Sequence, residues 1–267
     1  QEIHIASKAL ALPIVLVGAM ARIVLLENVH GLPPGRATKD VDFAFALDNW
    51  DQFTAIKAFM LSNANFEESK HVVHRLHFHA EGFEHQYKVD LIPFGGIEAS
   101  PNTIAWPPDM AVMMNVAGFG DALAAAVSVE VSPGIEIAVA SLPGIAILKL
   151  FAWADRGQEN PKDAIDLVLL LRNYGDAGNA SRIYEEASAL AALEAAGYDL
   201  ELAGAWLLGS DATAMVSAQT RAGLEALLSG PKREKLIKDM ARAMLGRDDA
   251  LDCSHRLLEQ FTKGFTA

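Results

Sequence analysis

An apolar run that carries two carboxylates constrains this chain more than any other feature. Residues 38–47 read Thr-Lys-Asp-Val-Asp-Phe-Ala-Phe-Ala-Leu. Because alternate side chains of a β-strand point to the same face, a strand here would place Asp40 and Asp42 side by side. Aspartate is depleted in strands and like charges on one face repel, so the pair needs a counter-charge. A hard divalent cation bound through oxygen is one candidate, and a solvated strand edge is the alternative.

Composition limits the classes of protein to consider. The chain has 267 residues, enough for one large domain or two small ones, and its 51% hydrophobic content predicts an ordered core. The net charge of −12 argues against a uniformly basic nucleic-acid-binding surface, although a local basic patch stays open. The single cysteine, Cys253, cannot form a disulfide within the chain and fits a reducing compartment.

The longest apolar run does not have the pattern of a membrane span. Residues 9–26 are interrupted by Pro13, Gly18 and Arg22, which suits a strand, a turn and a helix better. No basic segment of a secretory signal is visible at the start of the chain. We therefore expect a cytoplasmic protein that does not associate with a membrane.

The first unit of this run is a strand, a glycine and a helix. Residues 14–17 predict a buried strand, Gly18 follows directly, and residues 19–26 predict a helix. A glycine at this point lets main-chain amides at the start of a helix approach a phosphate, although an ordinary tight turn has the same appearance. The loop 31–37 then leads into the strand that carries Asp40 and Asp42.

A third carboxylate lies in a later strand. Residues 72–79 and 87–93 predict an antiparallel hairpin around a turn at 80–82, and Asp90 stands between Val89 and Leu91. A buried aspartate is costly unless it is paired or bound to a metal, so Asp90 is a natural third ligand beside Asp40 and Asp42. The alternative is a structural ion pair with an arginine such as Arg75.

Histidines crowd the same hairpin without a recognised metal-binding spacing. They are His71, His74, His77, His79 and His85. A zinc site is conceivable, but the spacings match no common pattern, so solvated or substrate-facing histidines are favoured.

The second half of the chain changes character. Strands are predicted at 127–131 and 135–139, and helices follow from Ser141 to Trp153 and from Asn160 to Leu171. After a glycine-rich turn at 175–179 only helices are predicted. The expected fold is α+β, with a mixed-sheet core in residues 1–174 and an all-helical domain in residues 175–267.

Several segments together resemble the nucleotidyltransferase superfamily that includes DNA polymerase β, and more closely the AbiEii/AbiGii type. Many members of that type are toxins of toxin–antitoxin pairs. The resemblance covers about residues 12–174. The segments that carry it are Val17–Arg22, Arg36–Asp42, Asp90–Gly95, Leu148–Lys149 and Lys162–Leu167.

The resemblance implies a two-metal transfer of a nucleoside monophosphate from a nucleoside triphosphate, with release of pyrophosphate. Asp40, Asp42 and Asp90 would bind two Mg²⁺ or Mn²⁺ ions. Lys149 would neutralise the triphosphate, and Asp163 or Asp166 would orient Lys149 or contact the acceptor. A helix–helix ion pair is the alternative for these last three residues.

The nucleotide itself would lie against residues near the first two segments. Gly18 and the amides that follow would hold the β- and γ-phosphates, and Arg22 and Arg36 are further phosphate candidates. Ala19 stands where the family usually has glycine or serine, so no hydroxyl is available there. Thr38 belongs to the second segment. The alternative for Arg22 is a solvated position on the helix.

The sequence leaves the acceptor undecided and allows two alternative functions. The acceptor is RNA, a protein or a small molecule, and the resemblance implies a cognate antitoxin protein. Lysines and arginines at helical spacing in residues 232–247 would suit RNA, but a solvated helix face is favoured. Two competing functions share the fold: a non-catalytic nucleotide- or partner-binding module, and a nucleotidyltransferase that modifies small molecules such as antibiotics.

Overall fold

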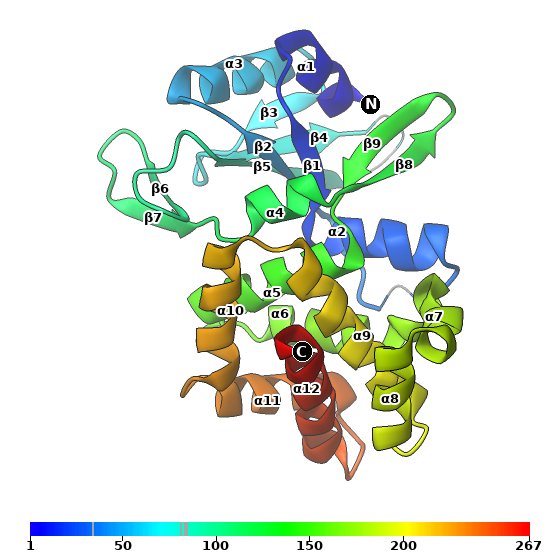
Figure 1. Cartoon of the computed structure of the whole chain (residues 1–267). Helices are drawn as coiled ribbons and strands as arrows, with labels where there is room; N and C mark the ends of the chain where they lie inside the picture. Colours follow the sequence, from blue (N-terminus) through cyan, green and yellow to red (C-terminus); the bar gives the residue numbers. More distant parts are fainter. Residues whose placement is uncertain (34, 81, 83–84) are drawn as a thin grey trace. The chain divides into compact units, whose positions relative to one another are not determined.

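The computed structural model describes residues 1–33, 35–80, 82 and 85–267 (Figure 1). The chain packs into two compact units. The first consists of Gln1–Arg22 and Arg36–Ser141, and the second of Ile23–Gly35 and Leu142–Ala267. Pro34 of the predicted loop at 31–37 and Glu81 of the predicted turn at 80–82 lie outside the described residues.

A mixed seven-stranded sheet forms the centre of the first unit, in the order β3-β4-β5-β2-β1-β9-β8. Strand β2 lies antiparallel to β1 and parallel to β5, which in turn lies antiparallel to β4. The strands are β1 (Ile14–Val17), β2 (Asp40–Ala46), β3 (Phe66–Glu68), β4 (Arg75–His79), β5 (Gln86–Phe94), β8 (Val127–Ser132) and β9 (Ile135–Val139).

The predicted hairpin is confirmed as β4 and β5, but β4 begins three residues later than the alternation suggests. The amide of Arg75 donates to the carbonyl of Val72 at 3.1 Å, and the amide of Val72 donates to Ser69 Oγ at 3.3 Å. The residues before Arg75 therefore form a hydrogen-bonded turn, and strand pairing starts only at Arg75.

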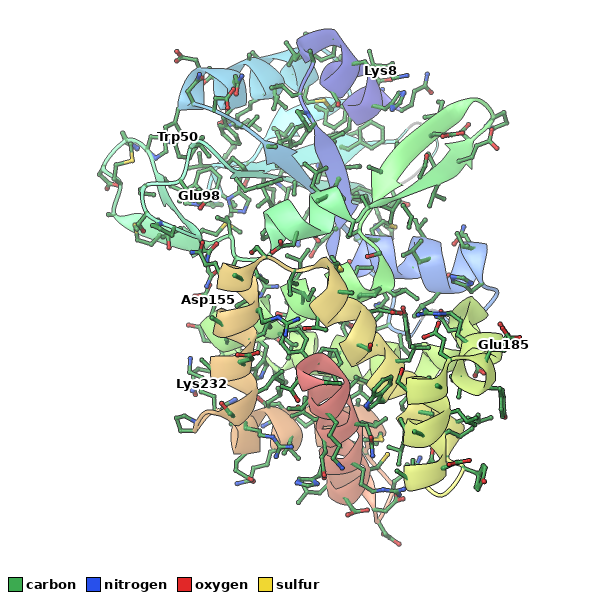
Figure 2. All side chains as sticks on the ribbon, in the orientation of Figure 1. Lys8, Trp50, Glu98, Asp155, Glu185 and Lys232 are labelled. Carbon is green, nitrogen blue, oxygen red and sulfur yellow. The ribbon has the colours of Figure 1, made fainter. Side chains whose placement is uncertain are left out.

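The described residues of this unit form the helices α1 (Glu2–Leu10), α2 (Gly18–Ile23), α3 (Trp50–Leu61) and α4 (Phe119–Ala124). Asn49 caps α3 by accepting from the amide of Gln52 at 3.1 Å. Trp50, labelled in Figure 2 at the start of α3, packs with Phe53 and with Trp106. Trp106 is buried and anchors its segment.

The proline-flanked segment 101–108 contains part of a second sheet. Strand β6 (Thr103–Trp106) pairs antiparallel with β7 (Val112–Asn115). The prolines on both sides of the segment suggested a loop, but the run Thr-Ile-Ala-Trp pairs because Ile104, Ala105 and Trp106 are buried together.

The second unit is helical. Its α-helices are α5 (Leu142–Arg156), α6 (Lys162–Asn173), α7 (Ala180–Glu185), α8 (Ala187–Ala195), α9 (Leu200–Met215), α10 (Ala218–Ser229), α11 (Arg233–Ala241) and α12 (Ala250–Thr266). The helix predicted over 19–26 continues past α2 as a π-helical turn, Val24–Val29. Helices α9 and α12 pack closely at glycines: a Cβ at Gly209 would lie 2.1 Å from the Phe261 carbonyl.

These observations confirm the α+β class and the helical C-terminal region. The units of packing do not follow the predicted division at 174/175, because α5 and α6 pack with α9, α10 and α11. The predicted domain boundary at 174/175 stays a prediction. Among the described residues, no helix has the length and apolar character that crossing a membrane requires.

Candidate active site

Gly18 and Asp42 are in van der Waals contact where β1 ends. Val17 is the cross-strand partner of Asp42, so the next residue, Gly18, turns the chain directly beside this carboxylate. Gly18 has φ +69°, a left-handed conformation that favours glycine. A Cβ built on Gly18 would lie 2.1 Å from Asp42 Oδ2. The glycine is therefore required both by the turn and by the carboxylate.

Asp42 is the first residue of a charged row that crosses three neighbouring strands of the sheet. Asp42 on β2 is the register partner of Asp90 on β5, and Asp90 is the partner of Arg75 on β4. Register partners point to the same face of a sheet, so the three charged side chains are neighbours. Val89 and Leu91, which flank Asp90, point to the opposite face and are buried. The alternation of β5 thus places Asp90 beside Asp42.

Arg75 holds Asp90 with two hydrogen bonds. Its Nε donates to Asp90 Oδ1 at 2.7 Å and its Nη2 donates to Oδ2 at 2.8 Å. This is the fork geometry of strong arginine–carboxylate pairs. The hydrogen bonds to Asp90, together with the nearby charges of Asp40 and Asp42, raise the pKa of Arg75 above its usual value. The ion-pair alternative for Asp90 is therefore present in the structure.

Asp40 lies two residues before Asp42 on the same face and is more open to solvent. Its carboxylate Oδ1 is 3.6 Å from Lys88 Nζ, and both side chains are about half exposed. Thr38 shapes the entry to the strand, since its hydroxyl accepts from the amide of Asp40 at 3.1 Å. The ion pair of Asp40 with Lys88 is thus longer and more exposed to solvent than the ion pair of Asp90 with Arg75.

His74, a member of the predicted histidine cluster, approaches the carboxylates. Its Nε2 lies 4.0 Å from Asp90 Oδ2, and its ring stacks on Trp106 with centroids 5.0 Å apart. Burial lowers the pKa of His74, outweighing the opposite effect of Asp90. A neutral imidazole is expected there at neutral pH.

Arg22 does not lie in solvent, so the solvated alternative is wrong. Its side chain is buried, and Nη2 donates to the carbonyl of Arg36 at 3.1 Å. This bond ties the end of α2 to the segment before β2. Arg36 itself is exposed, and Ala19 is buried in α2. The predicted phosphate contacts of these residues stay predictions.

In the second unit, Lys149 lies between two carboxylates. Its Nζ donates to Asp163 Oδ1 at 2.9 Å and to Asp166 Oδ2 at 2.6 Å. The three residues are buried on the facing helices α5 and α6. The structure therefore contains the helix–helix ion pair that the sequence left as the alternative, and it also contains the orienting contacts that the resemblance implies.

Arg156 is a member of this cluster that the sequence reasoning missed. Its Nε donates to Asp163 Oδ2 at 2.8 Å. Burial alone would raise the pKa of Asp163, but Lys149 and Arg156 together hold it below its usual value. The signal was available: Arg156 follows Lys149 by seven residues, close to two helical turns, and so lies on the same face of α5.

The basic segment at 232–247 is engaged within the second unit. Lys235 Nζ donates to the carbonyl of Gly157 at 2.8 Å and forms an ion pair with Asp239. Lys232, labelled in Figure 2, donates to the carbonyl of Ala154 at 2.8 Å. These lysines satisfy carbonyls at the C-terminal end of α5. A role of this segment in binding RNA, the alternative to the favoured solvated helix face, stays a hypothesis.

The carboxylates suit a divalent cation by their chemistry. Asp40, Asp42 and Asp90 offer oxygen ligands from one sheet face, and the missing Cβ of Gly18 leaves room for Asp42. Within the described ranges, however, no three side chains of His, Cys, Asp or Glu converge closely enough to hold a metal, and this includes the histidines of the hairpin. Arg75 supplies the positive charge at Asp90 instead.

The glycine turn after a strand, the strand with two carboxylates and the third carboxylate on a later strand are the motifs on which the resemblance to nucleotidyltransferases rests. The model of one family, "Nucleotidyl transferase AbiEii toxin, Type IV TA system", matches residues 4–260. The chain belongs to this family, which confirms the resemblance and the general class of nucleotidyltransferase toxins. Comparison with curated proteins finds no significant match.

Proposed function

We propose that this nucleotidyltransferase uses a divalent cation to move a nucleoside monophosphate from a nucleoside triphosphate to an acceptor hydroxyl, releasing pyrophosphate. One observation carries the proposal: Asp42 lies between Gly18 and Asp90, in contact with the glycine and in register with the second carboxylate. An aspartate with a purely structural role would require neither contact with a glycine in a left-handed turn nor a second carboxylate beside it.

Asp40, Asp42 and Asp90 would hold the cation, in this proposal Mg²⁺ or Mn²⁺, and their side chains would have to converge further than they do in this structure. When bound, two such ions would offset the negative charge that develops on the attacking and leaving oxygens. The chain's own part is to fix the carboxylates: β2 and β5 hold Asp42 and Asp90 in register, and Thr38 fixes the strand at Asp40. The amides after Gly18 would face the triphosphate.

The cluster around Lys149 supports a different role from the one implied by resemblance alone. Two carboxylates already balance the charge of Lys149, and its side chain is buried. We propose that this cluster fixes α5 against α6. A contact of Lys149 with the triphosphate would require Lys149 to exchange one of its carboxylate partners for a phosphate.

The family also supports proposals about partners. A type IV toxin–antitoxin family implies a cognate antitoxin, and a nucleotidyltransferase implies a nucleoside triphosphate. The net charge of −12 favours a protein or small-molecule acceptor over tRNA. The presence of all three carboxylates favours an enzyme over a non-catalytic module with the same fold.

The test is a transfer assay with each α-labelled nucleoside triphosphate, in Mg²⁺ or Mn²⁺, against a mixture of tRNA and cell protein. The proposal expects label on one acceptor class, and loss of labelling on chelation of the metal. Transfer that continues undiminished with a chelator would contradict metal dependence. The absence of transfer together with retained nucleotide binding would favour the non-catalytic module.

A further inference from the structure

Asp90 already has a cation at both of its oxygens in this structure. The guanidinium of Arg75 bonds Oδ1 and Oδ2 at 2.7 and 2.8 Å, and Asp90 is only 7% exposed. A metal ion binds a carboxylate through the same oxygen lone pairs and with the same sign of charge. A cation at Asp90 must therefore share or replace the hydrogen bonds of Arg75.

Arg75 is placed so that it could release Asp90 without breaking the sheet. It is the first residue of β4, directly after the turn in which its amide bonds to Val72. Its side chain is 23% exposed, so it is not fully enclosed by the protein. Rotation of the side chain alone would open Asp90, because the main-chain pairing of β4 with β5 does not involve the guanidinium.

Lys88 provides a comparison on the same face of the sheet. Its Nζ lies 3.6 Å from Asp40 Oδ1, and the exposed fractions of the two side chains are 45% and 41%. This pair is longer, open to solvent and without fork geometry. Lys88 therefore adds positive charge near the carboxylates but does not occupy both oxygens of any of them.

We infer that Arg75 is a built-in competitor for the divalent cation: it holds Asp90 in the metal-free protein and must share or give up its hydrogen bonds to the Asp90 oxygens when Asp90 serves as a ligand. The inference rests on the proposed function, since it takes Asp90 as a metal ligand. Arg75 thereby sets the metal concentration at which the site fills, and it keeps a buried carboxylate paired until then.

The experiment measures binding of Mn²⁺ to the full chain without nucleotide, by the electron paramagnetic resonance signal of free Mn²⁺. Arg75→Met should bind Mn²⁺ about tenfold more tightly than wild type, because a charge-assisted double hydrogen bond no longer competes. Lys88→Met, the matched control for the loss of one positive charge, should change the dissociation constant much less. The rise in melting temperature on adding Mn²⁺ should also be larger for Arg75→Met than for wild type.

Three results would overturn the inference. Folded Arg75→Met that binds Mn²⁺ no more tightly than wild type would show that Arg75 only orients Asp90. A gain in Lys88→Met equal to that in Arg75→Met would show a general charge effect. If Arg75→Met does not fold, Arg75→Lys, which keeps the charge and loses the fork, decides: tighter binding supports competition, and an unchanged dissociation constant excludes it.

One further variant separates this inference from the proposed function. If wild type binds Mn²⁺ and Asp42→Asn does not, the metal site stands whatever Arg75→Met does. If no variant binds Mn²⁺, or if Asp42→Asn binds as well as wild type, the metal site is wrong and nothing remains for Arg75 to compete with.

Discussion

The charge cluster on the sheet and the charge cluster between α5 and α6 use similar side chains in different surroundings. On the sheet, Asp40 is half exposed and Arg75 is partly exposed, so the charges meet water on one side. Between α5 and α6, Lys149 and its partners Asp163 and Asp166 are buried. Both clusters pair aspartates with cations at hydrogen-bonding distance.

The difference in burial separates what each cluster can do. An ion pair with a partly exposed cation, such as that of Arg75, can exchange this cation for another at lower cost than a fully enclosed pair, because water replaces some of the lost contacts. A buried cluster loses several kcal/mol when one member is removed, since its partners stay buried without a counter-charge. We therefore expect the sheet cluster to determine chemistry and the helix cluster to determine stability.

The largest expected effect on stability is that of Lys149→Ala. It leaves Asp163 and Asp166 buried with less positive charge, and we expect the free energy of unfolding to fall by about 3–5 kcal/mol. Chemical denaturation measures this. The control is Arg172→Ala, which breaks a partly exposed pair with Glu201 and should cost about 1 kcal/mol or less. A stable Lys149→Ala that has lost nucleotide binding would instead support a triphosphate contact.

Gly18→Ala should have a smaller effect on stability and a larger one on transfer. The left-handed φ costs about 1–2 kcal/mol for a residue with a Cβ. The added atom also lies where Asp42 Oδ2 is, so Asp42 must move. We expect transfer to fall further than the folded fraction does, as measured by activity per folded molecule.

Gly134→Ala is the matched control for this variant. Gly134 has φ +75°, and a Cβ there would meet nothing within 4 Å. It should show only the backbone cost, about 1–2 kcal/mol, with normal transfer. Equal transfer rates in the two alanine variants would show that the contact between Gly18 and Asp42 does not matter for function.

The sequence predicts much of the sheet cluster because its signals are local. Alternation places Asp40 and Asp42 on one face, and the glycine after a buried strand marks the turn at Gly18. The sequence suggests the pairing of Asp90 with Arg75 only as an alternative, because strand register depends on where pairing begins. Pairing of β4 begins at Arg75, directly after a turn in which the amide of Val72 donates to the hydroxyl of Ser69.

The helix cluster was harder to predict because its contacts join separate helices. The spacing of Asp163 and Asp166 gives a shared helix face, but which charge faces them depends on how α5 packs on α6. Strands β6 and β7 were missed for a similar reason: the burial of Trp106 against Trp50 and Phe53 outweighs the nearby prolines. Long-range packing decides both cases.

The smallest expected effect is that of Lys88→Met. Its pair with Asp40 is long and half exposed, so the free energy of unfolding should change by less than about 1 kcal/mol. Thermal denaturation at low and high salt measures the contribution, which should disappear at high salt. A loss comparable to that of Lys149→Ala would mean that the sheet cluster is as rigid as the helix cluster.

The most direct test of the account is the rate of nucleotide transfer by Asp42→Asn, measured per folded molecule. The substitution keeps the size of the side chain and removes one charged ligand, so we expect the rate to fall by at least about 100-fold while the melting temperature stays near that of wild type. Asp51→Asn, the same change at an exposed position of α3, should transfer normally. A rate for Asp42→Asn close to that of wild type would contradict the claim that this sheet face is the active site.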